Sequence, residues 1–348
     1  MLKVRRYVGI VTAVLALMLV AAACGGDDDD GGTDGGSDPG GSDVALTGSV
    51  TISGSSTVLP ISSLVAELFR ETNPDVAITV DGPGTGDGFE LFCAGDTDIS
   101  DASRPIDEEE VAACEVAGIG YVELEVAIDG IAVLTNPAND VTCLSQADLY
   151  SLFGPESEGF TSWSDANGLA TEVGGNGGFP DVPLEITAPG EESGTYDSFI
   201  DINGFEDIAL ERGVAEDSAA SLRKDYQASP DDNVIISAME GSETPLGFVG
   251  FAYAEEAGDA VKEVEIDGGS GCVAPSSDSI ADGSYPISRS LYIYVNSANA
   301  AASPALQAFV DFYVSDEGLQ TAVSEVGYVN LPADRIEAVR SAWGSAAV

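Results

Sequence analysis

Strand-like and helix-like segments alternate along this chain from Gly48 onward, and this order restricts the fold more than any other feature. Apolar residues recur at helical spacing from Ile61 to Leu68, between apolar runs at Val50–Ser53 and Val76–Val80 that are typical of buried strands. The same order returns between Asp98 and Cys114. Repeated strand–helix–strand order predicts an α/β fold with mainly parallel sheets.

Two longer β-rich stretches, Val122–Thr135 and Ser288–Asn296, interrupt this alternation. We expect both to be crossover strands that form a hinge between two lobes. One lobe would hold residues 46–130 and 285–348, and the other would hold residues 131–284.

The first residues have the pattern of an export signal. A positively charged start is followed by an apolar run from Val8 to Ala23, which is too short for a comfortable membrane span. Small residues then precede Cys24, and this resembles a bacterial lipobox. We therefore expect residues 1–23 to be a lipoprotein signal peptide and Cys24 to carry the lipid; plain secretion with cleavage near Ala23 is the alternative.

Residues 24–45 are expected to form a flexible linker, because Gly, Asp and Ser dominate a stretch that cannot build a core. The protein would then be extracytoplasmic and anchored by lipid to the cell membrane, at the cell surface or in the periplasm. The lipid bilayer is thus a partner through Cys24.

The charge and the missing histidines exclude several classes of function. The formal net charge is −48, which makes nucleic acid a poor partner and favours a surface adapted to a salty medium. The chain contains no histidine, so Ser-His-Asp catalysis, Cys-His catalysis and His-ligated zinc are excluded. No Asp-rich calcium loop is visible. We expect neither an enzyme nor a metal or cofactor site.

Four cysteines remain besides Cys24, and in an exported chain they suggest two disulfides. Four cysteines allow three pairings. We favour Cys93–Cys114, which closes a short loop, together with Cys143–Cys272, which closes a long one.

Four short segments with hydroxyls or glycines each follow a predicted strand and precede a predicted helix. Free amides at a helix N-terminus and the helix dipole favour an anion, and ligands of open α/β sheets bind beyond the carboxyl ends of the strands. Each segment alone is an ordinary helix cap or turn, but their joint occurrence indicates an anion site. The segments are Gly-Ser-Ser-Thr-Val-Leu-Pro at 54–60, Gly-Thr-Gly-Asp-Gly-Phe at 84–89, Asp-Ile-Ser-Asp-Ala-Ser-Arg-Pro-Ile at 98–106, and Ser-Gly-Thr at 193–195.

In this order the four segments resemble the phosphate-binding protein of high-affinity phosphate ABC importers. Two later stretches, Asp225–Asn233 and Leu246–Tyr253, fit one branch of that family, and the resemblance covers residues 48–332. It implies a two-lobe type II periplasmic-binding-protein fold that closes on inorganic phosphate. It also implies the membrane permease of an importer as partner, and we expect the receptor to be a monomer.

The resemblance also implies the ligand-binding residues. The positive charge is assigned to Arg104, and we expect Arg104→Ala to weaken binding by roughly 2–5 kcal/mol, as for one side of a buried charged pair. The chain has Pro189 where many members have an arginine. The acceptor for a phosphate proton stays open, with Asp87 as one candidate. The implied phosphate-binding residues are Ser56, Thr57, Val58, Thr85, Ser103, Arg104, Ser193, Gly194 and Thr195.

Two other functions stay open from the sequence. The receptor could serve another tetrahedral oxyanion, such as sulfate, molybdate or arsenate. A hydrolase that works without histidine, through a serine or aspartate nucleophile, is the alternative from a different class.

Overall fold

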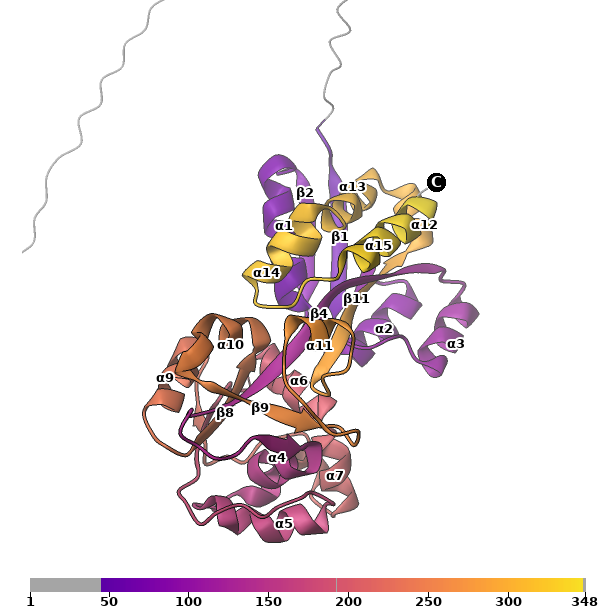
Figure 1. Ribbon diagram of the computed structural model, residues 1–348. Helices are drawn as coiled ribbons and strands as arrows, with labels where there is room; N and C mark the ends of the chain where they lie inside the picture. Colours follow the sequence, from indigo (N-terminus) through magenta and orange to yellow (C-terminus); the bar gives the residue numbers. More distant parts are fainter. Residues whose placement is uncertain (1–44, 192, 347–348) are drawn as a thin grey trace, which may run out of the picture. The chain divides into compact units, whose positions relative to one another are not determined.

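A sheet of 11 strands runs through the part of the chain that this computed structural model describes, residues 45–191 and 193–346 (Figure 1). The signal peptide, Cys24 and all but the last residue of the predicted linker lie outside the described residues. The strands are β1 (Gly48–Gly54), β2 (Val76–Asp81), β3 (Ile99–Ala102), β4 (Tyr121–Thr135), β5 (Cys143–Ser145), β6 (Glu185–Ala188), β7 (Gln227–Ala228), β8 (Pro245–Gly250), β9 (Lys262–Asp267), β10 (Cys272–Val273) and β11 (Ser288–Asn296).

Helices connect most of these strands, as the alternating sequence pattern predicts. They are α1 (Leu59–Thr72), α2 (Thr85–Ala94), α3 (Glu108–Ala117), α4 (Gln146–Phe153), α5 (Asn167–Glu172), α6 (Gly194–Ile202), α7 (Phe205–Glu211), α8 (Glu216–Ala219), α9 (Asp232–Glu240), α10 (Phe251–Ala257), α11 (Ser277–Ala281), α12 (Ser297–Ala302), α13 (Pro304–Tyr313), α14 (Val323–Glu325) and α15 (Ala333–Ala346). The α/β class is confirmed.

The sheet is mixed, and the strand order is β2-β1-β3-β11-β4-β8-β6-β7. Parallel pairs lie on both flanks, β2-β1-β3 on one side and β8-β6-β7 on the other. Antiparallel β4 and β11 lie between them, because the chain crosses from one flank to the other and back.

The long strand β4 divides the sheet into two halves. Its residues Tyr121–Gly130 pair with β11, and Ile131–Leu134 pair with β8. We call the side of β2, β1, β3 and β11 the first half, and the side of β8, β6 and β7 the second half; they occupy the upper and lower parts of Figure 1. The chain returns through Tyr285, whose hydroxyl donates to the carbonyl oxygen of Ile131 (2.9 Å). This is a two-lobe fold with a crossing at β4 and β11, and the exact lobe limits stay a prediction.

Helix α1 shows how the sequence builds the first half. Pro60 fits the first helical turn, where no intrahelical amide bond is needed. Ile61, Val65 and Phe69 recur on one face and are buried against the sheet. The helix ends at Asn73, just before Pro74. Because α1 starts directly after the turn that follows β1, this turn is fixed at the carboxyl end of the strand.

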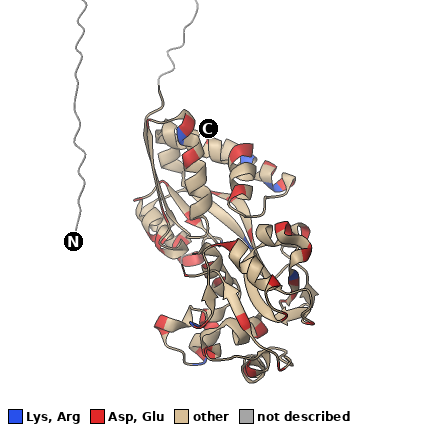
Figure 2. Ribbon diagram, turned by 90° about the vertical axis from the view of Figure 1, so that its left-hand side faces the viewer, with Lys and Arg blue, Asp and Glu red and all other residues tan. Residues whose placement is uncertain are grey.

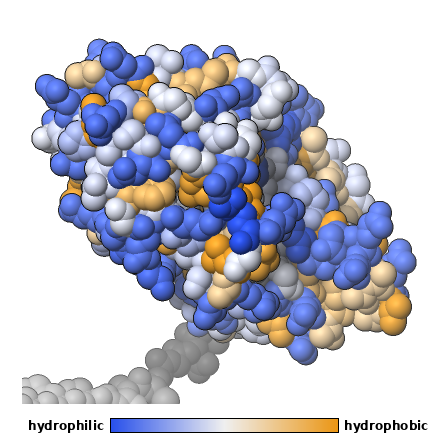
Figure 3. Space-filling model, turned by 90° about the horizontal axis from the view of Figure 1, so that it is seen from below, coloured by the Kyte–Doolittle hydropathy of each residue, from blue (hydrophilic) through white to orange (hydrophobic). Residues whose placement is uncertain are grey.

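The two favoured disulfides are confirmed: Cys93 is bonded to Cys114, and Cys143 to Cys272. Acidic side chains are spread over many helices and loops, whereas basic ones are few (Figure 2). On the face seen in Figure 3, hydrophobic residues form small patches among hydrophilic ones. Within residues 45–191 and 193–346, no helix has both the length and the apolar character needed to cross a membrane.

Candidate functional site

The turns after β1, β2 and β3 lie side by side and are tied together by hydrogen bonds. The amide of Gly84 donates to the carbonyl oxygen of Gly54 (2.9 Å), and the hydroxyls of Thr85 and Ser103 are 3.0 Å apart. Parallel strands end at the same edge of a sheet, so hydroxyls that are far apart in the sequence meet there.

A cavity of about 340 Å³ opens at this edge between the two halves. Its wall contains five of the residues proposed from the sequence, which are Ser56, Thr57, Thr85, Ser103 and Arg104. It also contains residues that the sequence did not single out, of which the charged ones are Asp197, Asp201 and Arg289.

The Ser-Gly-Thr turn of the second half begins α6 next to this cavity. The Ser193 hydroxyl accepts a hydrogen bond from the amide of Thr195 (3.2 Å), which makes Ser193 the N-cap of α6. Gly194 packs directly against the backbone of Thr57. The turn thus supports the wall of the cavity, although none of its three residues is among those that line it.

Two further residues named from the sequence are not in the cavity wall. Val58 is fully buried, and its amide donates to the hydroxyl oxygen of Ser55 (3.3 Å). Asp87 lies in the first turn of α2 and is exposed. Asp87 is therefore poorly placed to accept a proton from an anion in the cavity.

Arg104 reaches the cavity, but its guanidinium is already paired. It donates to both carboxylate oxygens of Glu110, at 2.8 and 2.7 Å, and a side-chain exposure of 41% leaves it partly in water. The hydrogen bond to Glu110 raises the pKa of Arg104. Glu110 of α3 thus neutralises much of the positive charge of Arg104, which we had expected to bind the anion.

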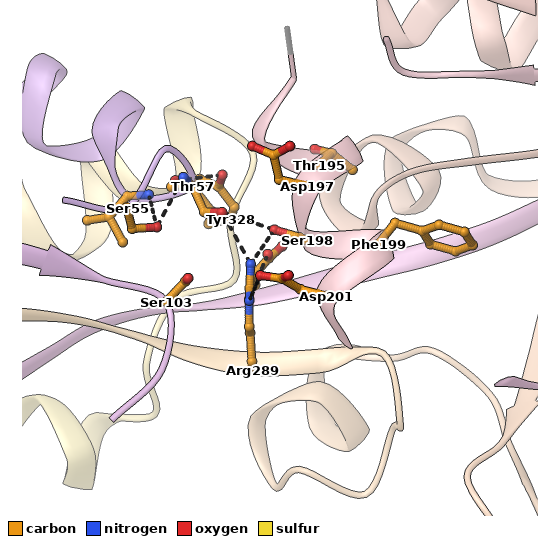
Figure 4. Close-up of polar contacts among 12 residues, drawn as sticks. Ser55, Thr57, Ser103, Thr195, Asp197, Ser198, Phe199, Asp201, Arg289 and Tyr328 are labelled. Atoms are coloured by element: carbon orange, nitrogen blue, oxygen red, sulfur yellow. Dashed lines mark hydrogen bonds and ion pairs between the residues drawn. The ribbon is translucent and has the colours of Figure 1, made fainter. Parts of the chain in front are cut away.

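Arg289 is the more central cation, with a side-chain exposure of 16%. Its Nη2 donates to the hydroxyl oxygen of Ser198 (2.8 Å) and to that of Thr57 (3.3 Å), and its Nη1 lies 3.2 Å from a carboxylate oxygen of Asp201 (Figure 4). Because Thr57 precedes α1 and Ser198 lies on α6, this guanidinium contacts both halves of the sheet.

Carboxylates also face the cavity. Asp197 accepts a hydrogen bond from the hydroxyl of Ser56 (2.9 Å), and burial raises the pKa of Asp197. Asp201, one turn further along α6, is 62% exposed at its side chain. The wall therefore combines two guanidiniums with two carboxylates and several hydroxyls, which suits an anion that still carries a proton.

A metal is not favoured by this arrangement. Within the described parts of the chain, no cluster of Cys, Asp and Glu side chains has the arrangement that could hold a metal ion.

The sequence contained a usable signal for the residues that we missed. Arg289 is one of only 12 basic residues and lies inside an alternating strand pattern, where a charge needs a partner. Asp197 and Asp201 are four residues apart and start right after the Ser-Gly-Thr turn, so they share the helix face that begins at the site.

Comparisons with known proteins identify what this chain is similar to. Residues 39–317 match the family model described as a PBP superfamily domain. The phosphate-binding protein PstS of Staphylococcus epidermidis is 33% identical over 86% of this chain and 84% of its own length.

Solved structures give the same result. A possible phosphate-binding protein from Planctomyces limnophilus is 35% identical, with a TM-score of 0.76 over 86% of this chain and 99% of the other. An ABC-type phosphate transport receptor from Vibrio cholerae is 26% identical, with a TM-score of 0.58 over 81% of this chain and 100% of the other.

Proposed function

This chain belongs to the PBP superfamily and to its group of phosphate-binding receptors, and we propose that it binds inorganic phosphate outside the cytoplasm and delivers it to the permease of an ABC importer. Its relatives include a phosphate-binding protein, and we infer that this chain likewise binds its solute without catalysing a reaction. The observation that carries the proposal is the cavity between the two halves, whose wall brings together hydroxyls, helix ends and guanidiniums.

The first half supplies neutral donors for the anion. The hydroxyls of Thr85, Ser103 and Ser56 line the cavity, and helices α1 and α2 begin next to it. Hydrogen bonds to a charged acceptor are stronger than neutral ones, and they strengthen further when the site is shielded from water. Such donors can bind phosphate without a large positive field.

Arg289 supplies the charge and connects the two halves. Its Nη atoms contact Thr57 and the α6 residues Ser198 and Asp201. A guanidinium offers paired donors that match the geometry of a tetrahedral oxyanion. An anion bound beside it would contact both halves at once, and it would therefore favour the closed state over an open one.

The carboxylates argue against sulfate, molybdate and other anions without a proton at neutral pH. Asp197 and Asp201 repel a fully ionised anion, but each can accept a proton that phosphate still carries. Arsenate has the same protonation behaviour as phosphate and stays the main competitor.

Membrane attachment belongs to the same proposal. Lipid on Cys24 would hold the receptor at the membrane, and the flexible linker expected over residues 25–45 would let its folded body reach the permease. The receptor would act as a monomer. Metabolic labelling with a radioactive fatty acid tests this, since Cys24→Ala should abolish the label and release the protein from the membrane fraction.

Isothermal titration calorimetry of the purified protein tests phosphate binding. We expect one site with a dissociation constant at or below the micromolar range, displacement by arsenate, and no heat from sulfate. Absence of heat and of competition with phosphate would overturn the proposal. Turnover of an aryl phosphate by the same preparation would instead support the hydrolase alternative.

A further inference from the structure

Asp129 and Arg289 face each other at the point where the sheet changes from one half to the other. They are directly opposite in the antiparallel pair β4–β11, and the next position of β4 is Gly130, the last residue that pairs with β11. From Ile131 onward β4 pairs with β8. Opposite residues of neighbouring strands have their side chains on the same face, so the two side chains meet there.

The three nitrogens of the Arg289 guanidinium have different surroundings. Nη2 donates to Ser198 and Thr57, and Nη1 approaches Asp201, at the cavity. The Nε atom lies 3.8 Å from the Oδ2 atom of Asp129. The two edges of one planar group thus serve two purposes, with the Nη edge at the cavity and the Nε edge towards β4.

The Oδ2 atom of Asp129 and the Nε atom of Arg289 form a buried ion pair, and the 3.8 Å between them is too long for a hydrogen bond. The Asp129 side chain is 2% exposed, and neither its Oδ2 atom nor the Arg289 Nε atom has a hydrogen-bond partner among the described residues. Leaving one buried charge without its partner costs far more than an exposed pair gains. Each side chain therefore restricts where the other can lie.

Asp201 provides a contrast, because it pairs with the same guanidinium from the solvent side. Its side chain is 62% exposed. An exposed partner is held weakly and can be displaced by a ligand, whereas a buried partner stays in place. The Nη1 atom of Arg289 is thus open to exchange between Asp201 and an anion, and the Nε side is not.

The charge balance around Asp129 fits this role. Burial raises the pKa of Asp129, whereas the Arg289 guanidinium and a hydrogen bond from Ser198 oppose the rise and favour the carboxylate. Tyr328 is a further titratable group near it, and burial together with the Asp129 charge raises the pKa of Tyr328. The Arg289 guanidinium and the Ser198 hydroxyl thus both stabilise the ionised form of Asp129.

We propose that Asp129 is a positioning residue, which fixes the Nε edge of Arg289 at the crossing of the two halves and so directs the Nη edge into the phosphate cavity. This inference rests on the proposed phosphate receptor function. It assigns a binding role to a residue that lies outside the cavity wall and does not itself touch the ligand.

The sign of the change in affinity tests the proposal. Removing a negative charge near an anion site tightens binding if only Coulomb repulsion matters. If Asp129 positions Arg289, the near-isosteric change Asp129→Asn weakens phosphate binding instead, and we expect a loss of about tenfold or more. The exposed Asp207→Asn on α7 is the matched variant and should leave binding unchanged.

Calorimetry on these variants separates the possible outcomes. In an Arg289→Lys background Asp129→Asn should change the dissociation constant by less than about threefold, because the positioned group is gone. Tighter or unchanged binding in Asp129→Asn, or an equal loss in both backgrounds, would overturn the inference. Failure of the wild-type protein to bind phosphate would instead overturn the proposed function.

A measurement on the wild-type protein tests the positioning of Arg289 even if Asp129→Asn folds poorly. The Nε–H signal of Arg289, assigned by its loss in Arg289→Lys, should exchange with water much more slowly in ¹⁵N NMR spectra than that of the partly exposed Arg104. Equal exchange rates at the two arginines would contradict a fixed Nε edge.

Discussion

Gly194 and Thr57 are in contact across the two halves of the sheet, and a side chain at position 194 would be crowded against the backbone of Thr57. A Cβ atom built on Gly194 would lie 3.2 Å from the Cα atom of Thr57 and 3.3 Å from the carbonyl oxygen of Ser56. The turn before α6 and the turn before α1 therefore meet backbone to backbone at the edge of the cavity.

This contact predicts the effect of a larger residue at position 194. Gly194→Val should push the two turns apart and weaken phosphate binding by about 1–3 kcal/mol, the usual cost of overpacking. Gly168→Ala on α5 is the control, because a Cβ there meets nothing within 4 Å. Calorimetry measures the affinities, and equal values for Gly194→Val and the wild type would contradict the prediction.

The two cavity arginines should differ when each is changed to lysine. Arg289→Lys keeps the charge but loses the planar fork that contacts Thr57 and Ser198, so we expect affinity to fall by about tenfold or more. Arg104→Lys should cost less, because the Arg104 fork is already bound to Glu110.

For the same reason we now expect Arg104→Ala to fall below the 2–5 kcal/mol range given for a buried charged pair. Phosphate titrations of the two lysine variants, at the same ionic strength, measure the difference. A larger loss for Arg104→Lys than for Arg289→Lys would show that the charge assignment from the sequence was the better one.

Asp197 should control discrimination between phosphate and sulfate. Asp197→Asn removes a carboxylate from the cavity wall and keeps a side chain of the same size, so sulfate should gain affinity and phosphate should lose part of its advantage. Competition of sulfate against labelled phosphate measures this ratio. If sulfate is excluded equally from the wild type and Asp197→Asn, another group performs the selection.

Asp101 should make the folded protein less stable as the pH rises. Burial raises the pKa of Asp101 from 3.8 to about 7, although the hydrogen bond from Ser62 acts in the other direction. Between these values the folded state binds a proton that the unfolded state has lost, so stability falls as the pH rises through this window. Above about pH 7 the full cost of burying the ionised carboxylate is present.

Urea unfolding of the wild type and Asp101→Asn measures this effect at both ends of the window. The variant, which cannot ionise, should gain stability relative to the wild type when the pH is raised from 5 to 8. A difference in unfolding free energy that does not depend on pH would contradict the assignment of this pKa to Asp101.

The disulfide between Cys143 and Cys272 should contribute stability without affecting the site. It joins residues 129 positions apart, and a long closed loop restricts the unfolded chain. The double change Cys143→Ser and Cys272→Ser should lower the unfolding free energy by about 2–4 kcal/mol. Phosphate affinity should stay the same, because neither cysteine lines the cavity. A parallel loss of affinity would show that the two halves depend on this bond.

Much of the fold followed from local patterns in the sequence. Periodic apolar residues and the breaks at Pro60 and Asn73 placed α1, and alternating segments placed β1 and β2. The loop lengths between cysteines led to the favoured disulfides, which the structure contains. These features depend on residues that are close together in the sequence, so local sequence patterns can predict them.

Part of the site also followed from such patterns. The hydroxyls of Ser56, Thr57, Thr85 and Ser103 come after strands, and the carboxyl ends of parallel strands share an edge. Arg104 was found by the same rule, but its pairing with Glu110 depends on how α3 packs, which the spacing alone does not give.

By itself the sequence determined an α/β fold and the turns that surround an anion, because helix caps, strand periods and glycine turns are set by residues next to one another; the two-lobe receptor fold followed from the resemblance to a family. Only the tertiary structure decided that Arg289 is the central cation and that Asp129, Asp197 and Asp201 surround it. These side chains come from β4, β11 and α6, which are brought together when the chain crosses twice between the two halves. The electrostatic potential of a site depends on the distances between charged groups, and these distances are set only when the chain folds.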